Sequence, residues 1–140
     1  MHKGILSTGL ALGLGLSVAV VSVAVSAGGI SGKTNLVCAS VDVVGCTDDN
    51  CLRGQAHTFD MPTFMFIDVK RKLVHGTDES DKEISSPIKA FEITENAIIL
   101  QGFENHRGWT LGIERKTGEM TMSATGADVS FMVFGNCTER

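Results

Sequence analysis

Hydrophobic and polar residues alternate with a period of two along much of the chain after residue 35. Valines alternate with smaller or polar residues over 36–46, and residues 108–115 place Trp109, Leu111 and Ile113 on one side. This period is typical of a β-strand with one face in a core and the other in solvent. Because no stretch of this region keeps a helical period, the pattern predicts an all-β protein.

Six further stretches predict strands. Residues 63–69 are apolar on both faces, with Phe64 and Phe66 on one and Met65 and Ile67 on the other, which indicates a central or strongly curved strand. The other predicted strands are 73–75, 88–94, 97–103, 119–125 and 129–134. Turn sequences separate them, so we predict about seven to eight antiparallel strands in a single small meander barrel or sandwich, cross-linked by disulfides.

The predicted inward faces are rich in large apolar side chains. They are Phe64, Phe91, Trp109, Met120, Met122 and Phe131. Such residues ordinarily form the core that a domain of this size needs. A small barrel can also enclose one small ligand, so a small apolar ligand is one candidate partner.

The first 27 residues predict an export signal. A short basic start is followed by an uncharged apolar run at 4–27 that ends in small residues, and we expect cleavage after Ala27. The run is long for a signal, so an uncleaved membrane anchor is the alternative. We therefore expect a flexible lead at 28–34 and one β domain at 35–140, secreted or periplasmic, with membrane contact only through the signal segment.

All four cysteines lie after the predicted signal, and an even number in an exported chain predicts two disulfides. Sequence alone allows three pairings. We favour Cys46–Cys51, which would close a short polar turn, and Cys38–Cys137, which would join the first strand to the last. Zinc binding is the alternative, but the spacing matches no standard finger or ribbon, and we predict no metal site.

Residues 28–140 have 11 basic and 16 acidic side chains, a net charge of −5. This balance is unfavourable for nucleic-acid binding, which needs clustered Lys and Arg, but it is compatible with a basic protein partner. The most acidic stretch is 76–86, predicted to be a loop, and Asp78, Glu79 and Asp81 are its candidate contact residues. A solvated loop with no partner is the alternative.

A second candidate contact is the polar cluster Glu104-Asn105-His106-Arg107, which directly precedes the segment with the only tryptophan. Glu104 and His106 could form an acid–base pair, and Arg107 could bind a carboxylate or phosphate with two hydrogen bonds. Four polar residues between two strands are also what a hairpin turn needs. We therefore predict a turn first and a ligand contact second.

The sequence does not indicate an enzyme. It has no GxSxG or HExxH motif, and bridged cysteines would leave no thiol nucleophile. The remaining histidines, His57, His75 and His106, lie far apart in the sequence, each beside a predicted turn or strand end. We predict a non-enzymatic protein without a cofactor, and a histidine-dependent hydrolase using Glu104 and His106 is the alternative.

Motifs in the second half support a resemblance. Arg107-Gly108-Trp109 with Ile113, then Thr117-Gly118, and a close at Phe131, Phe134-Gly135 and Cys137 form an RGWxxxI, TG and FxxFGxC pattern. This pattern resembles small secreted proteobacterial proteins, a group that implies export but no functional residues.

In size, export, disulfides and β content the chain is also loosely similar to the periplasmic inhibitors of lysozyme. Those proteins typically present a Ser-Gly loop and a tyrosine, whereas this chain has Ser123-Ala124-Thr125-Gly126 and no tyrosine. We thus predict an exported β-barrel-like protein with a binding or envelope-associated role. Inhibition of a basic hydrolase such as lysozyme is the alternative function that this similarity implies.

Overall fold

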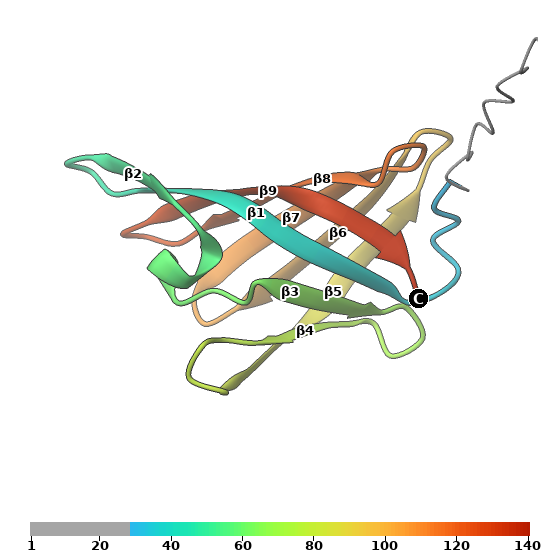
Figure 1. The fold of residues 1–140 in the computed structure, drawn as a ribbon, viewed down its shortest axis with the longest axis horizontal. Helices are drawn as coiled ribbons and strands as arrows, with labels where there is room; N and C mark the ends of the chain where they lie inside the picture. Colours follow the sequence, from blue (N-terminus) through green and yellow to red (C-terminus); the bar gives the residue numbers. More distant parts are fainter. Residues whose placement is uncertain (1–28) are drawn as a thin grey trace, which may run out of the picture.

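The computed structural model describes residues 29–140 as a closed antiparallel β-barrel of eight strands, with a short ninth strand at one end (Figure 1). The elements are β1 (Leu36–Cys46), β2 (Cys51–Gly54), the 3-10 helix η1 (Ala56–Phe59), β3 (Phe64–Asp68), β4 (Leu73–Thr77), β5 (Glu83–Ile93), β6 (Ala97–Glu104), β7 (Arg107–Glu114), β8 (Glu119–Thr125) and β9 (Ser130–Glu139). The predicted signal at 1–27 lies outside the described residues. None of the helical segments in residues 29–140 has the length and hydrophobicity to span a membrane.

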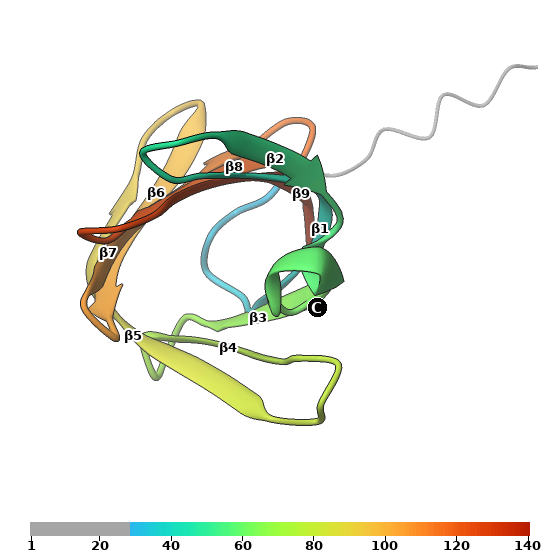
Figure 2. The same cartoon turned by 90° about the vertical axis from the view of Figure 1, so that its left-hand side faces the viewer.

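The barrel closes because β1 pairs with other strands along both of its edges. Its first half pairs with β3, its second half pairs with β2, and its other edge pairs with β9, the last strand (Figure 2). Strands β3 to β9 follow one another as a meander. Closure leaves these strands without the long open edges that favour aggregation. The prediction of a small all-β meander barrel is therefore confirmed.

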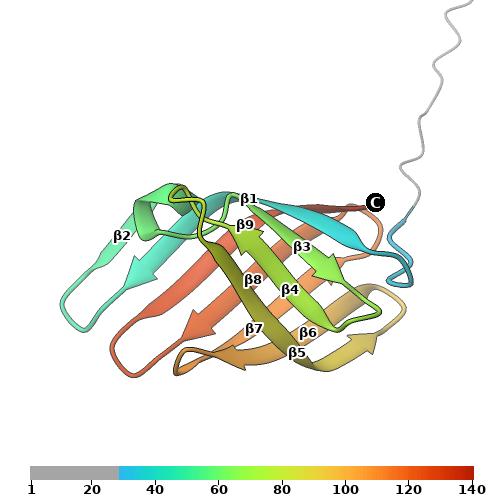
Figure 3. The same ribbon diagram turned by 90° about the horizontal axis from the view of Figure 1, so that it is seen from below.

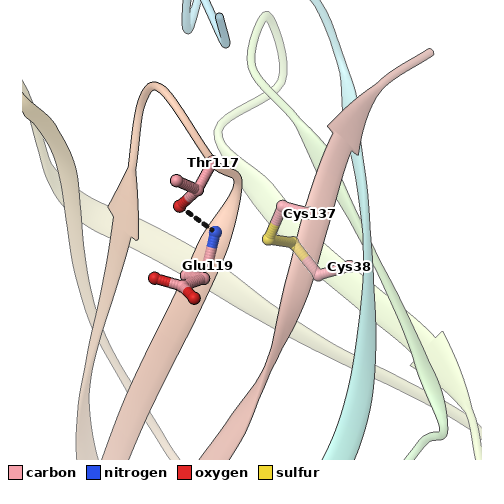
Figure 4. Close-up of a disulfide and its surroundings, with 4 residues drawn as sticks. All are labelled: Cys38, Thr117, Glu119 and Cys137. Carbon is pink, nitrogen blue, oxygen red and sulfur yellow. Dashed lines mark hydrogen bonds between the residues drawn. A yellow bond between two sulfur atoms is a disulfide. The ribbon is translucent and has the colours of Figure 1, made fainter. Parts of the chain in front are cut away.

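Both predicted disulfides are present. Cys38 and Cys137 are directly paired residues of β1 and β9, and their bridge lies close to the turn between β7 and β8 (Figure 4). In that turn the amide of Glu119 donates to the hydroxyl of Thr117 at 3.2 Å. Cys46 and Cys51 close the β1–β2 hairpin.

Buried side chains fill the inside of the barrel, and Trp109 of β7 is one of them. Trp109 is 8% exposed, and its indole Nε1 donates to the hydroxyl of Ser86 on β5 at 2.7 Å. Gly102, the β6 residue opposite Trp109, leaves room for the ring, because a Cβ there would lie 2.2 Å from it. The predicted inward positions of Trp109, Leu111 and Ile113 are confirmed.

Two predicted inward positions are wrong. Phe64 is 54% exposed on the outer face, because Met65 and Ile67 occupy the inward side of β3. Val41, one of the alternating valines at 36–46 that were expected to face the core, is 61% exposed, because the buried residues before it are Leu36, Cys38 and Ser40. An irregularity in the pairing with β9 between Ser40 and Asp42 then turns Val43 inward.

Three local elements differ from the sequence pattern. Residues 51–54 and 56–59 lie in the turn-like sequence between two predicted strands, but they form β2 and η1. β5 begins at Glu83, inside the predicted loop 76–86, because its first residues pair with β4. In each case pairing or packing with another element overrides a polar, turn-like composition.

The two ends of the barrel are covered differently. At the end where the described chain begins, the Ile30 amide donates to the Arg115 carbonyl at 2.7 Å, and the Arg115 Nε donates to the Ile30 carbonyl at 2.9 Å. Ile30 is 5% exposed, so part of the predicted flexible lead packs against the core. At the opposite end, η1 buries Ala56, and Phe59 meets the edge of Phe131 with 5.8 Å between the ring centroids.

Candidate functional site

Every loop that contains a candidate contact residue lies at the same end of the barrel. This end holds the β1–β2 turn, η1, the β4–β5 loop, the β6–β7 turn and the β8–β9 turn, at the left in Figure 1. The β1–β2 hairpin projects beyond the strands there (Figure 3). The chain enters at the opposite end, beside the β3–β4, β5–β6 and β7–β8 turns.

Charge is divided unequally between these two ends. What we call the acidic end has ten carboxylates and three cations, a net charge of −7: Asp42, Asp48, Asp49, Asp60, Asp78, Glu79, Asp81, Glu83, Glu104 and Asp128, with Arg53, Lys82 and Arg107. What we call the entry end has six carboxylates and eight cations, a net charge of +2: Asp68, Glu92, Glu95, Glu114, Glu119 and Glu139, with Lys33, Lys70, Arg71, Lys72, Lys89, Arg115, Lys116 and Arg140. All of the excess negative charge of the domain therefore lies at the acidic end.

The side chain of Asp78 fixes the conformation of the predicted acidic loop. Its Oδ1 accepts from the amides of Ser80 at 2.9 Å and Lys82 at 3.0 Å, which closes the connection between β4 and β5. Glu79 and Asp81 are exposed on this loop. Asp78 is thus partly used by the fold, whereas the other two carboxylates face solvent.

A weak ion pair places the acidic loop beside η1. The Nδ1 of His57 lies 3.8 Å from Glu79 Oε1, and both side chains are largely in water. Exposed pairs of this kind contribute little to stability. The contact shows instead that two segments far apart in sequence share one surface.

The second predicted cluster forms a tight hairpin turn. Asn105 and His106 have φ values of 48° and 63°, both left-handed, as a two-residue type I′ turn requires, and Glu104 pairs with Arg107 across it. The two turn residues are exposed at its tip. Arg107 leans over the ring of Phe131, with 5.6 Å from its Cζ to the ring centroid, so this side chain lies at the mouth of the barrel.

The β1–β2 hairpin is held by one disulfide and one ion pair. The Thr47 amide donates to the Asn50 carbonyl at 2.9 Å inside the bridge, which leaves Asp48 and Asp49 exposed at the tip. Lower down, the Arg53 Nε donates to Asp42 at 2.7 Å. This hydrogen bond from Arg53 lowers the pKa of Asp42, and the same contact raises the pKa of Arg53.

Exposed hydrophobic side chains accompany the carboxylates at this end. Leu52 is 60% exposed, Phe64 54% and Phe103 57%, and they come from the three strands β2, β3 and β6. Apolar side chains beside charged ones are common on protein interaction surfaces. None of the three is recognisable as a surface residue from the sequence, since a single apolar residue in a turn or on a strand gives no signal by itself.

The histidines lie on three separate elements. His57 is on η1, His106 is in the β6–β7 turn, and His75 is on β4, where it stacks on Phe66 with 5.5 Å between the ring centroids. Within residues 29–140, no group of three or more His, Cys, Asp or Glu side chains could hold a metal ion, and no cysteine is free.

Two open hollows lie on the outer wall of the barrel. One, of about 400 Å³, lies beside Phe66 and Arg140 near the entry end. The other, of about 390 Å³, lies over β1, β9 and β8 beside Val41 and Phe134. The middle of the barrel interior is filled by side chains such as Leu100 and Leu111, both 0% exposed.

Comparisons with known proteins do not assign the chain to a family: no protein-family model and no curated protein matches it.

Proposed function

We propose that this protein is an exported, non-enzymatic binding protein whose acidic end binds a cationic protein or peptide. The observation that supports the proposal is the net charge of −7 on one end of a barrel whose other end is +2. A surface of one sign steers an oppositely charged partner and raises the rate of association. The two disulfides are typical of proteins in oxidising compartments outside the cytoplasm.

The acidic end offers such a partner both electrostatic attraction and direct apolar contacts. Glu79, Asp81 and Asp49 extend into solvent from two different loops, so they can meet Lys or Arg side chains without first breaking a buried contact. Leu52 and Phe103 offer apolar area that charge alone does not supply. The bridged β1–β2 hairpin presents its tip in a restricted conformation, which reduces the entropy lost on binding.

A matched pair of charge variants tests this proposal. The first, Asp49→Asn with Glu79→Gln and Asp81→Asn, removes three negative charges from the acidic end. The control, Glu92→Gln with Glu95→Gln and Glu119→Gln, removes three from the entry end. Binding of polylysine and of a basic protein is measured by titration calorimetry at low and high salt.

We expect the first variant to bind roughly tenfold more weakly at low salt, since each exposed charge contact contributes about 0.5 kcal/mol, and the control to bind like the wild type. High salt should reduce the difference. Equal weakening in both variants would mean that overall charge, not the acidic end, attracts the probe. No binding by the wild-type protein would refute the proposal.

Inhibition of a basic hydrolase such as lysozyme is a second candidate function, favoured by the same acidic end. A substrate cleft of a basic enzyme would receive the projecting β1–β2 hairpin or the loop with Glu79 and Asp81. A turbidity assay on bacterial cell walls gives the test. Undiminished lysozyme activity at micromolar concentrations of this protein would exclude inhibition of lysozyme while leaving cationic binding intact.

A further inference from the structure

The entry end has a local cluster of cations that the acidic-end proposal does not use. We infer that this cluster, which we call the basic rim (Lys33, Lys70, Arg71, Lys72 and Arg140), is a binding surface for anionic membrane lipids. It orients the barrel so that the acidic end points away from the membrane. This inference does not depend on which partner the acidic end binds.

The basic rim is assembled from three segments that are far apart in the sequence. Asn35 joins them: its side-chain Oδ1 accepts from the Val69 amide at 3.1 Å, and its carbonyl accepts from the Arg140 amide at 2.9 Å. The segment before β1, the β3–β4 turn and the end of β9 are thereby held together. The five cations are thus neighbours through folding, not through a single basic stretch.

All five rim cations are exposed, and the nearby carboxylates have other hydrogen bonds. Asp68 accepts from the Arg71 amide at 2.9 Å, and Glu139 accepts from the Ser31 amide at 2.6 Å. Five cations against these two carboxylates give a local charge of +3 in a domain whose net charge is −5. Such a concentration of like charge is unfavourable unless an anion compensates it.

Arg140 is also held in a defined place on this rim. Its Cζ lies 5.6 Å from the centroid of the Phe66 ring, and the same ring stacks on His75. A guanidinium that lies over an aromatic ring can still donate hydrogen bonds from its N–H groups at the edge of the group. Here Arg140 and Phe66 both line the open hollow near the entry end, so these donors are accessible there. Arginine is well suited to bind the phosphate of a lipid headgroup with two hydrogen bonds.

The described chain begins at the entry end, and the apolar run of the sequence precedes it. Ile30 is fixed to Arg115 by two hydrogen bonds, and the uncharged apolar run of the sequence ends at Ala27. Three residues span at most about 11 Å, which is close to the distance over which charges act at physiological salt. An apolar run kept in a bilayer as an anchor would hold the entry end, and with it the rim, close to the headgroups.

Charge on the rest of the molecule favours the same orientation. An anionic leaflet attracts basic side chains close to its surface and repels carboxylates. Because one end has a net charge of −7 and the other carries the basic rim, the barrel would bind with the rim against the bilayer and the acidic end pointing away from it. The exposed residues of the acidic end, such as Leu52 and Glu79, would then remain accessible to a partner.

Vesicle binding tests the inference with the processed chain 28–140, which contains the whole barrel, its core and both disulfides. Co-sedimentation is measured with phosphatidylcholine vesicles and with vesicles of equal parts phosphatidylcholine and phosphatidylglycerol. The rim variant is Lys70→Gln with Arg71→Gln and Lys72→Asn; asparagine suits the positive φ of Lys72. A control of identical net charge adds Asn50→Asp, Gln55→Glu and Ala127→Glu at the acidic end.

The wild-type protein should bind only the phosphatidylglycerol vesicles, and added salt should release it. The rim variant should bind them roughly a hundredfold more weakly, and the control should stay within about threefold of the wild type. If the rim variant fails to fold by circular dichroism, Lys33→Gln with Arg140→Gln tests the other two segments and should bind about tenfold more weakly. Equal binding to neutral vesicles, or equal loss in rim variant and control, would overturn the inference.

Discussion

The acidic end and the entry end of this barrel are built from the same kind of part, short connections between antiparallel strands, yet they differ in charge and in how they are closed. Backbone hydrogen bonds around Ile30 and Asn35 hold the entry end. At the acidic end a short 3-10 helix covers the core, and Leu52, Phe64 and Phe103 stay in water. The fold does not require this division of charge, because most carboxylates of the acidic end are exposed. The binding proposal for the acidic end is based on this division.

The largest difference that we expect between the two ends concerns their disulfides. Replacing Cys38 and Cys137 by alanine should lower the free energy of unfolding by roughly 4–5 kcal/mol, since that bridge closes a loop of about 100 residues. The same change at Cys46 and Cys51 should lower it by only about 2 kcal/mol, since the loop is short. Urea denaturation of the two double variants measures both values. Equal losses would show that strain or unfolded-state structure, and not loop length, sets the contribution of each bridge.

A somewhat smaller effect should follow from replacing Trp109, which lies toward the acidic end of the interior. Trp109→Ala should destabilise the protein by roughly 3–5 kcal/mol, because it leaves a cavity against Gly102 and removes the donor to Ser86. Ser86→Ala, the matched control, removes only the hydrogen-bond acceptor and should cost about 1 kcal/mol. Thermal unfolding followed by circular dichroism compares them. A loss below about 1 kcal/mol for Trp109→Ala would mean that the acidic end is loosely packed beneath its loops.

The smallest predicted effect is a pH dependence at the entry end. Hydrogen bonds from the hydroxyl and amide of Ser31 lower the pKa of Glu139. A carboxyl whose pKa is lower in the folded state stabilises that state above its unfolded pKa, and this contribution is lost as the pH falls through the folded pKa. Because Glu139 is exposed, the effect should be under about 0.5 kcal/mol.

The measurement is the urea midpoint of the wild type and of Glu139→Gln between neutral pH and pH values below the ordinary Glu range. The wild type should lose stability more steeply than the variant on acidification. Glu95→Gln, on the neighbouring β5–β6 turn, is the control and should follow the wild type. If the urea midpoints of all three proteins fell in parallel with pH, the contact between Ser31 and Glu139 would not stabilise the segment before β1.

Sequence patterns predicted most of the barrel because most strands bury a single face. β7 alternates cleanly from Trp109 to Ile113, and after it Gly118 has a positive φ of 78° that suits glycine in the turn to β8. The pattern failed where a local irregularity or pairing with a neighbouring strand decides the outcome. The shifted pairing beside Val41 reverses which residues point inward, and β2 exists only because β1 extends far enough to pair with it.

The candidate site was only partly visible in the sequence. Asp78, Glu79 and Asp81 stood out as an acidic loop, and 104–107 as a polar turn, but nothing along the chain placed them at the same end. That placement follows from the direction of each strand, so it needed the topology. The basic rim gave even less signal, since Lys33 and Arg140 lie at opposite ends of the domain sequence.

The pairing of β1 with β9 has a consequence for how the molecule is made. A chain that emerges from its N-terminus presents β1 first, yet β1 finds its longest partner only when the final residues have appeared. No shorter, partly emerged chain can form the ring or bring Cys38 opposite Cys137. Closure of the ring is therefore the last step that the strand order permits, and oxidation of that cysteine pair cross-links the finished barrel.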